Sequence, residues 1–220
     1  MMYTLYKIVS GPMAWLSFSI FIGGFICRVW ELYRVAMRKE RFLFSHLSVK
    51  YSLRSLVRWF TPFSTMNMRM NPVLTVVSFV FHACIIALPL FLLSHVVLWE
   101  EAWGIHWWVL PDNIADGMTF VVLLACFFFA LRRILQSKVR YVSTPMDFIF
   151  LILVALPFAT GFYCYHQWPG YAVMLILHML SGEIVLAVVP FTRLGHMIYV
   201  LFTRSYMGSE FGAVRHAKDF

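Results

Sequence analysis

Five long apolar runs constrain this chain more than any other feature of its sequence. Charged side chains are sparse inside them, and they cover residues 12–33, 72–99, 117–135, 146–168 and 171–202. An α-helix needs about 20 apolar residues to cross a hydrocarbon core of about 30 Å. Lipid offers the backbone no hydrogen-bond partners, and the runs lack the alternation of barrel strands. We therefore predict an all-α membrane protein, a bundle of five transmembrane helices.

The composition agrees with this prediction. Apolar residues make up 61% of the chain and charged residues 13%, which is outside the range of soluble domains. The four cysteines lie within or beside the apolar runs, without the paired spacing of a zinc or iron–sulfur site, so we expect them to be packing residues: Cys27, Cys84, Cys126 and Cys164. The basic residues that give the net charge of +8 flank the spans. They accompany no nucleic-acid recognition motif, which argues against a nucleic-acid partner.

The distribution of lysine and arginine predicts the topology, because basic residues collect on the cytoplasmic side of short loops. They gather between the first two spans, between spans three and four, and after the last span: Arg34, Arg38, Lys39, Arg41, Lys50, Arg54, Arg58, Arg69, Lys138, Arg140, Arg204, Arg215 and Lys218. The connection between spans two and three instead carries Glu100, Glu101, Asp112 and Asp116 and no basic residue. We expect a single domain, residues 1–220, in the inner (cytoplasmic) membrane, with the N-terminus outside and the C-terminus cytoplasmic.

One loop segment, residues 45–60, is amphipathic. Lys50, Arg54 and Arg58 are spaced by four residues, and the apolar side chains lie mostly elsewhere on the helical wheel. We predict a cytoplasmic amphipathic helix lying flat on the membrane surface. Membrane anchoring and docking of a cytoplasmic subunit both remain open as its role.

Four histidines inside the spans carry the functional argument, because an ionisable side chain in a membrane is costly and marks a functional site. His82 and His95 lie in the second span, and His178 and His196 lie in the fifth. Antiparallel spans would bring His95 near His178 on the outer side and His82 near His196 on the inner side. This layout is typical of two stacked haems, each held by two imidazole ligands between facing helices.

The spacing of these histidines makes further predictions. The 18 residues from His178 to His196 equal five helical turns, so both would face one direction in a continuous helix. The 13 residues from His82 to His95 leave a rotation of about 140°, so the second span should be distorted, and Pro89 can supply a kink. Gly182 and Gly195 would let a flat macrocycle approach the backbone.

Three other polar residues accompany the fifth and fourth spans. Arg193, three residues before His196, could pair with a haem propionate or snorkel to the interface. Glu183 is the deepest acidic residue, with a protonated hydrogen bond and a proton pathway as the two interpretations. His166, at the end of the fourth span, could act as a substitute ligand or as a proton carrier.

These features together resemble a known family. Five helices with an outer N-terminus, histidine pairs in the second and fifth helices, and the segment LRRILQSKVRYVSTPMD at residues 131–147 resemble the gamma subunit of respiratory nitrate reductase. The closest similarity in character is to its relatives, the membrane cytochrome b subunits of heterodisulfide-reductase-like transmembrane redox complexes of sulfate reducers. The gap between His82 and His95 is longer than in the nitrate reductase pattern.

The resemblance implies an electron-transport subunit of a membrane oxidoreductase complex in anaerobic respiration. It would carry two haem b groups, with His82, His95, His178 and His196 as the axial ligands of their iron. Electrons would pass between a periplasmic multihaem cytochrome c or a quinol, with menaquinone as a further candidate cofactor, and a cytoplasmic iron–sulfur subunit.

The outer loop bears on the choice of donor. The nitrate reductase relatives place a lysine near the outer haem, whereas the outer loop here has four carboxylates, which suit a basic cytochrome c. The alternative from another class is a haem-free transporter or membrane assembly subunit that uses its intramembrane histidines for protons or packing.

Overall fold

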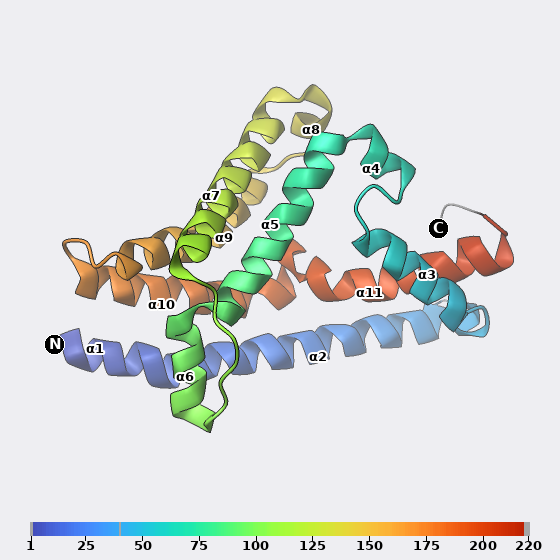
Figure 1. Cartoon of the computed structure of the whole chain (residues 1–220). Helices are drawn as coiled ribbons and strands as arrows, with labels where there is room; N and C mark the ends of the chain where they lie inside the picture. Colours follow the sequence, from blue (N-terminus) through green and yellow to red (C-terminus); the bar gives the residue numbers. More distant parts are fainter. Residues whose placement is uncertain (1, 40, 218–220) are drawn as a thin grey trace. The chain divides into compact units, whose positions relative to one another are not determined.

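The computed structural model describes residues 2–39 and 41–217, and within these ranges it consists of helices joined by turns and loops, with no strand (Figure 1). Five helical segments there are long and apolar enough to cross a membrane: Met2–Lys39, Pro72–Phe91, Asp112–Leu135, Pro145–Tyr165 and Tyr171–Phe191. The chain is therefore an all-α, multi-pass membrane protein, as predicted. The orientation of its termini stays a prediction, and Lys218 lies outside the described residues.

Internal contacts divide the chain into two compact units. Unit 1 comprises the N-terminal residues up to Ser10 and Val77–Gly182, and unit 2 comprises Gly11–Val76 and the residues from Glu183 onward. Two of the divisions fall inside helices, α5 (Pro72–Phe91) and α10 (Tyr171–Val188). The single membrane domain stays a prediction.

Unit 1 is built around α5, α7 (Asp112–Leu135) and α9 (Pro145–Tyr165). Its core joins residues of α5 and α7, among which Leu88 and Val122 are almost fully buried, and α7 also packs along α9 (Figure 1). Three cysteines are buried thiols in this unit, in keeping with a packing role: Cys84, Cys126 and Cys164. At 24 residues, α7 is about 36 Å long, enough to cross a bilayer.

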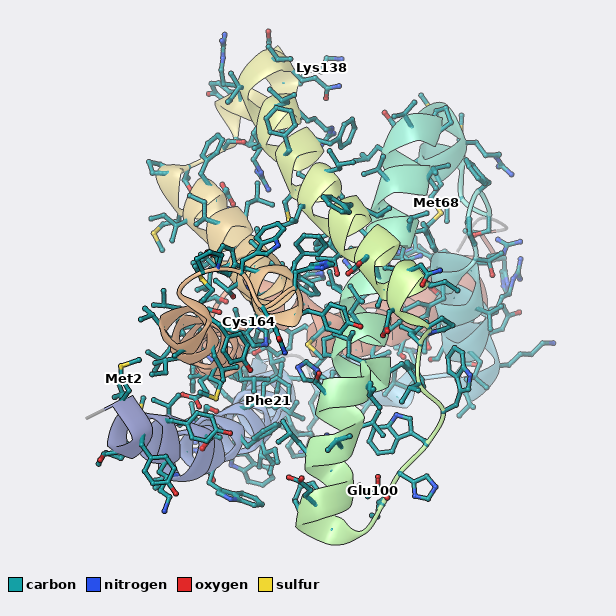
Figure 2. All side chains as sticks on the ribbon, turned by 60° about the vertical axis from the view of Figure 1, so that its left-hand side comes forward. Met2, Phe21, Met68, Glu100, Lys138 and Cys164 are labelled. Carbon is teal, nitrogen blue, oxygen red and sulfur yellow. The ribbon has the colours of Figure 1, made fainter. Side chains whose placement is uncertain are left out.

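A polar cluster joins the end of α7 to the start of α9 through the short helix α8 (Ser137–Tyr141). The Asp147 carboxylate accepts a 2.8 Å hydrogen bond from the Thr144 amide, which completes a capping box, and lies 3.7 Å from the Arg133 guanidinium. Figure 2 shows Lys138 and Glu100 at opposite ends of unit 1. The basic link and the acidic loop are therefore separated along the helices.

Unit 2 contains the elements between Gly11 and Val76 and those from Glu183 onward. The first span consists of α1 (Met2–Ile8, part of unit 1), the π-helical turn η1 (Val9–Met13) and α2 (Ala14–Lys39), so it extends beyond the predicted 12–33 at both ends. The predicted amphipathic helix is α3 (Val49–Phe60), preceded by the 3-10 turn η2 (Arg41–Ser45). In Figure 1, α3 lies beside α11 (His196–Met207), and it packs against both α11 and the following turn η5 (Gly208–Val214). The short helix α4 (Met66–Met70) precedes α5.

The second predicted span, 72–99, is not one helix, and this prediction was wrong. Helix α5 ends at Phe91, Leu92 is extended (φ −70°, ψ 133°), and α6 (Leu93–Trp103) follows. Pro89 lies in the last turn of α5, where it has no amide to donate and crowds the preceding turn. The predicted distortion is therefore a complete interruption.

The fifth predicted span, 171–202, is interrupted as well. Helix α10 ends at Val188 and is followed by the 3-10 turns η3 (Val189–Phe191) and η4 (Arg193–Gly195), with an extended Thr192 between them, before α11 begins. Pro190 contributes to this break because it lacks an amide. The third and fourth spans agree with prediction apart from their ends, since α7 begins at Asp112 and α9 ends at Tyr165.

Candidate functional site

The break after α5 places His95. In an uninterrupted helix, the carbonyls of Pro89, Leu90 and Phe91 would accept hydrogen bonds from the next turn, and the break removes those donors. Each carbonyl has a substitute donor: the His95 ring Nδ1 at 3.0 Å, the Trp107 indole at 2.7 Å and the Leu110 amide at 2.8 Å, respectively. An unpaired backbone carbonyl in lipid would cost several kcal/mol. The His95 ring is therefore held in place by a carbonyl that the helix break leaves without its regular donor.

His178, on α10, is also positioned by a bond from its ring to a backbone carbonyl. Its ring Nδ1 donates a 2.9 Å hydrogen bond to the carbonyl of Pro157, a proline inside α9. Gly161 follows one helical turn later, and a Cβ there would lie 2.9 Å from Cε1 and 3.1 Å from Nδ1 of His178. The ring thus rests on bare backbone that any side chain would cover.

The structure brings His95 and His178 together within unit 1. Their ring centroids are 6.1 Å apart and their planes differ by 12°. A carbonyl oxygen can only accept, so Nδ1 of each ring carries the proton and Nε2 carries the lone pair. This is the tautomer in which an imidazole ligates a metal through Nε2.

The distance between the two rings suits a metal-centred group. A metal ion midway between the two ring centres, which are 6.1 Å apart, would lie about 3 Å from each centre. This matches a metal–nitrogen bond of about 2 Å plus roughly 1 Å from the nitrogen to the ring centre. A Cβ on Gly182, one turn after His178, would meet nothing within 4 Å among the described residues, so that side of α10 is open. No group of three metal-binding side chains exists among the described residues, but a six-coordinate haem takes only two protein ligands. The two rings therefore supply the number and type of protein ligands that a six-coordinate haem takes.

The other two histidines lie in different units. His82, on α5 in unit 1, donates through Nδ1 to the Ser78 carbonyl at 2.7 Å. His196, the first residue of α11 in unit 2, donates through Nδ1 to the Arg193 carbonyl at 2.9 Å. Both rings therefore have the same tautomer as the first pair. Their pairing with each other stays a prediction.

One geometric expectation for the fifth span was wrong. Because 3-10 turns and an extended Thr192 separate α10 from α11, the 18-residue spacing does not place His178 and His196 on one face of a continuous helix. Arg193 begins the 3-10 turn that ends at His196, so it lies one such turn before His196, and its carbonyl accepts the bond from that ring. Gly195 accommodates the Tyr199 ring, whose Cε2 would lie 2.8 Å from an added Cβ.

His166 and Glu183, whose roles the sequence did not decide, lie in different environments. His166 Nε2 lies 3.3 Å from the Asp116 carboxylate, and its ring lies 4.4 Å from that of Phe162. Asp116 is at the start of α7, so His166 belongs to the acidic end of unit 1. The Glu183 oxygen Oε2 is buried and has no hydrogen-bond partner among the described residues.

Sequence reasoning missed three residues of this site, Pro157, Gly161 and Trp107. A signal for two of them exists, because a proline followed four residues later by glycine inside an apolar span marks exposed backbone on one face. Trp107 has no comparable signal, since its partner is a carbonyl that only the helix break exposes.

The fold and this site define a multi-pass, all-α membrane protein with a pair of pre-oriented histidines in a helix bundle. The chain is 34% identical over 215 residues to a protein of Nitratidesulfovibrio vulgaris strain Hildenborough, described only as "Protein". The alignment covers 96% of this chain and 95% of that relative, so the chain belongs to the same family as the Nitratidesulfovibrio protein. No protein-family profile and no solved structure matches it.

The substitution Trp107→Phe tests the capped break. It leaves the Leu90 carbonyl without its donor, and we expect a loss of about 1–3 kcal/mol in unfolding free energy. Thermal unfolding of the purified protein in detergent measures the effect. Trp108→Phe is the matched control, because Trp108 is largely exposed and its ring contacts Phe91. Equal stability of the two variants would contradict the capping role of Trp107.

Proposed function

We propose that the chain is a dihaem b-type cytochrome subunit that carries electrons across the membrane within a larger oxidoreductase complex. The observation that supports this most directly is the His95–His178 pair, with near-parallel rings 6.1 Å apart and both Nδ1 atoms bound to carbonyls.

His95 and His178 would hold one haem b, and His82 and His196 a second, with Arg193 as a candidate partner for a propionate. Haem b held by two imidazoles supplies one-electron transfer at the iron. The hydrogen bonds from Nδ1 to backbone carbonyls fix each ring and make it a more basic ligand. Gly161 and Gly182 keep the backbone beside His178 uncovered.

The opposite charges at the two ends of unit 1 suggest the partners. The acidic end carries the exposed Glu100 and Glu101, which suit a basic periplasmic cytochrome c, and a quinol such as menaquinone is the other candidate donor. The basic link between α7 and α9 would face a cytoplasmic iron–sulfur subunit in the inner membrane. A haem-free transporter or assembly subunit is the competing function, and haem content separates the two.

Replacing one histidine of the pair should remove one haem. We expect His178→Ala or His95→Ala to retain one haem per chain instead of two, because the two ligand pairs are separate. Pyridine haemochrome assay of the purified variants gives the count. His106→Ala is the control, since His106 is an exposed residue of the acidic loop. Loss of both haems from a variant that keeps its helical circular dichroism would contradict the pairing.

Gly161→Ala should weaken haem retention without removing a ligand. The added Cβ would displace the His178 ring, and loss of a ligand's correct orientation costs about ten-fold or more in metal affinity. Haem dissociation into apomyoglobin measures the change. Gly117→Ala is the control, because a Cβ there meets nothing within 4 Å. Identical dissociation from both variants would remove Gly161 from the site.

Exchange with the outer partner distinguishes a cytochrome c from a quinol. If Glu100 and Glu101 form a docking surface, changing both to Gln should lower the rate of exchange with a basic cytochrome c. The effect should fade as salt rises, because exposed charges are screened beyond about 8 Å at physiological ionic strength. Stopped-flow absorbance with a cytochrome c and with a quinol analogue measures both reactions. Fast, salt-independent reduction by the quinol with no response to the cytochrome would reject the docking surface.

A further inference from the structure

Thr160 places a buried hydroxyl beside the ring of His178. It lies on α9, three residues after Pro157 and one before Gly161, and 9% of it is exposed. Its Oγ1 atom lies 3.4 Å from Nδ1 of His178. Residues at positions i, i+3 and i+4 share one face of a helix, so this face of α9 supplies three neighbours of the same ring. All four residues belong to unit 1.

The Thr160 hydroxyl acts as an acceptor toward His178. Its single proton is donated to the Leu156 carbonyl at 2.7 Å, with the Pro157 carbonyl as a longer alternative at 3.3 Å. A hydroxyl has two lone pairs besides that proton, and Nδ1 of His178 already carries a proton of its own. The Nδ1–H group is therefore shared between the Pro157 carbonyl at 2.9 Å and the Thr160 oxygen.

The two rings of the pair differ in this respect. Nδ1 of His95 has the Pro89 carbonyl as its acceptor at 3.0 Å, and no hydroxyl among the described residues bonds to it. His178 has a carbonyl and a hydroxyl at the same atom. The second acceptor therefore gives His178 an electronic environment that His95 lacks.

The Thr160 oxygen makes the His178 ring more electron-rich. Acceptors on the Nδ1–H group of an imidazole ligand raise its basicity, and such outer groups tune a bound metal. The hydroxyl is polarised because its own proton is bound to the Leu156 carbonyl, and burial in a low dielectric strengthens the interaction. Greater electron density at Nε2 favours the oxidised, more positively charged state of a metal held there.

We propose that Thr160 is a positioning residue that tunes His178 as a haem ligand. By accepting part of the Nδ1–H bond, its hydroxyl lowers the reduction potential of the haem assigned to His95 and His178. The proposal rests on the proposed function, because the basicity of the ring acts through the bound iron. The competing explanation is that the hydroxyl serves only its own backbone, through the bond to the Leu156 carbonyl.

Thr119 provides a matched control for these two explanations. It is a threonine of α7 in the same unit, it is 8% exposed, and its hydroxyl donates to the Ala115 carbonyl at 2.8 Å. Thr119 therefore matches Thr160 in burial and in its backbone bond. Within the described residues, its hydroxyl has no bond to a histidine.

Redox titration of the b haems in the purified full-length protein tests the proposal. Thr160→Val removes the hydroxyl with little change of shape, so the potential of one haem should rise while the other stays unchanged. One long hydrogen bond should change the equilibrium constant for reduction about three-fold, or about 30 mV at about 59 mV per ten-fold for one electron. Thr160→Ser keeps the hydroxyl and should stay close to the wild-type potential. Thr119→Val should leave both potentials unchanged.

Electron paramagnetic resonance gives a second readout, because the low-spin ferric signal of a haem depends on its axial imidazoles. One signal should shift in Thr160→Val and recover in Thr160→Ser, with the haem count still at two per chain. If Thr160→Val does not fold, Thr160→Ala and Thr119→Ala allow the same comparison. Equal potentials in the Thr160 and Thr119 variants would overturn the tuning role alone, as would a lowered potential in Thr160→Val. A wild-type protein that binds no haem would overturn both this proposal and the proposed function.

Discussion

The candidate site depends on hydrogen bonds from histidine rings to backbone carbonyls. Lipid cannot satisfy a carbonyl that a helix break exposes, so another donor of the protein must do so. His95 meets this requirement at the Pro89 carbonyl, and His178 adds a ring donor to the Pro157 carbonyl inside α9. Both bonds determine which ring nitrogen keeps its lone pair. Each bond thus satisfies a backbone carbonyl and leaves Nε2 of the ring with its lone pair.

Within each unit, an interruption in an apolar span precedes a histidine. His95 lies in the first turn of α6 after the extended Leu92, and His196 begins α11 after the 3-10 turns. The second break is satisfied by side chains as well, since the Tyr199 hydroxyl donates to the Pro190 carbonyl at 2.9 Å. Irregular backbone at membrane depth is tolerated where protein groups satisfy it, and such places commonly bind ligands.

The sequence predicts the spans well and their interruptions poorly. Apolar length identifies all five spans, because hydrocarbon thickness sets a minimum that chance runs rarely reach. Pro89 signals a distortion, but hydropathy does not distinguish a kink from a break, since both leave the run apolar. The pairing of His95 with His178 follows from antiparallel connectivity. Gly161 and Trp107 could not be assigned, because their roles depend on contacts made only after the helices pack.

A reduced-minus-oxidised absorption spectrum of the purified full-length protein tests the central claim most directly. The account predicts b-type haem bands that bleach on oxidation, with a haem content of two per chain. Low-spin ferric signals in electron paramagnetic resonance should accompany them, because two imidazoles occupy both axial positions. A folded, monodisperse protein purified from haem-sufficient cells without these bands would contradict the account. It would assign the intramembrane histidines to proton handling or packing.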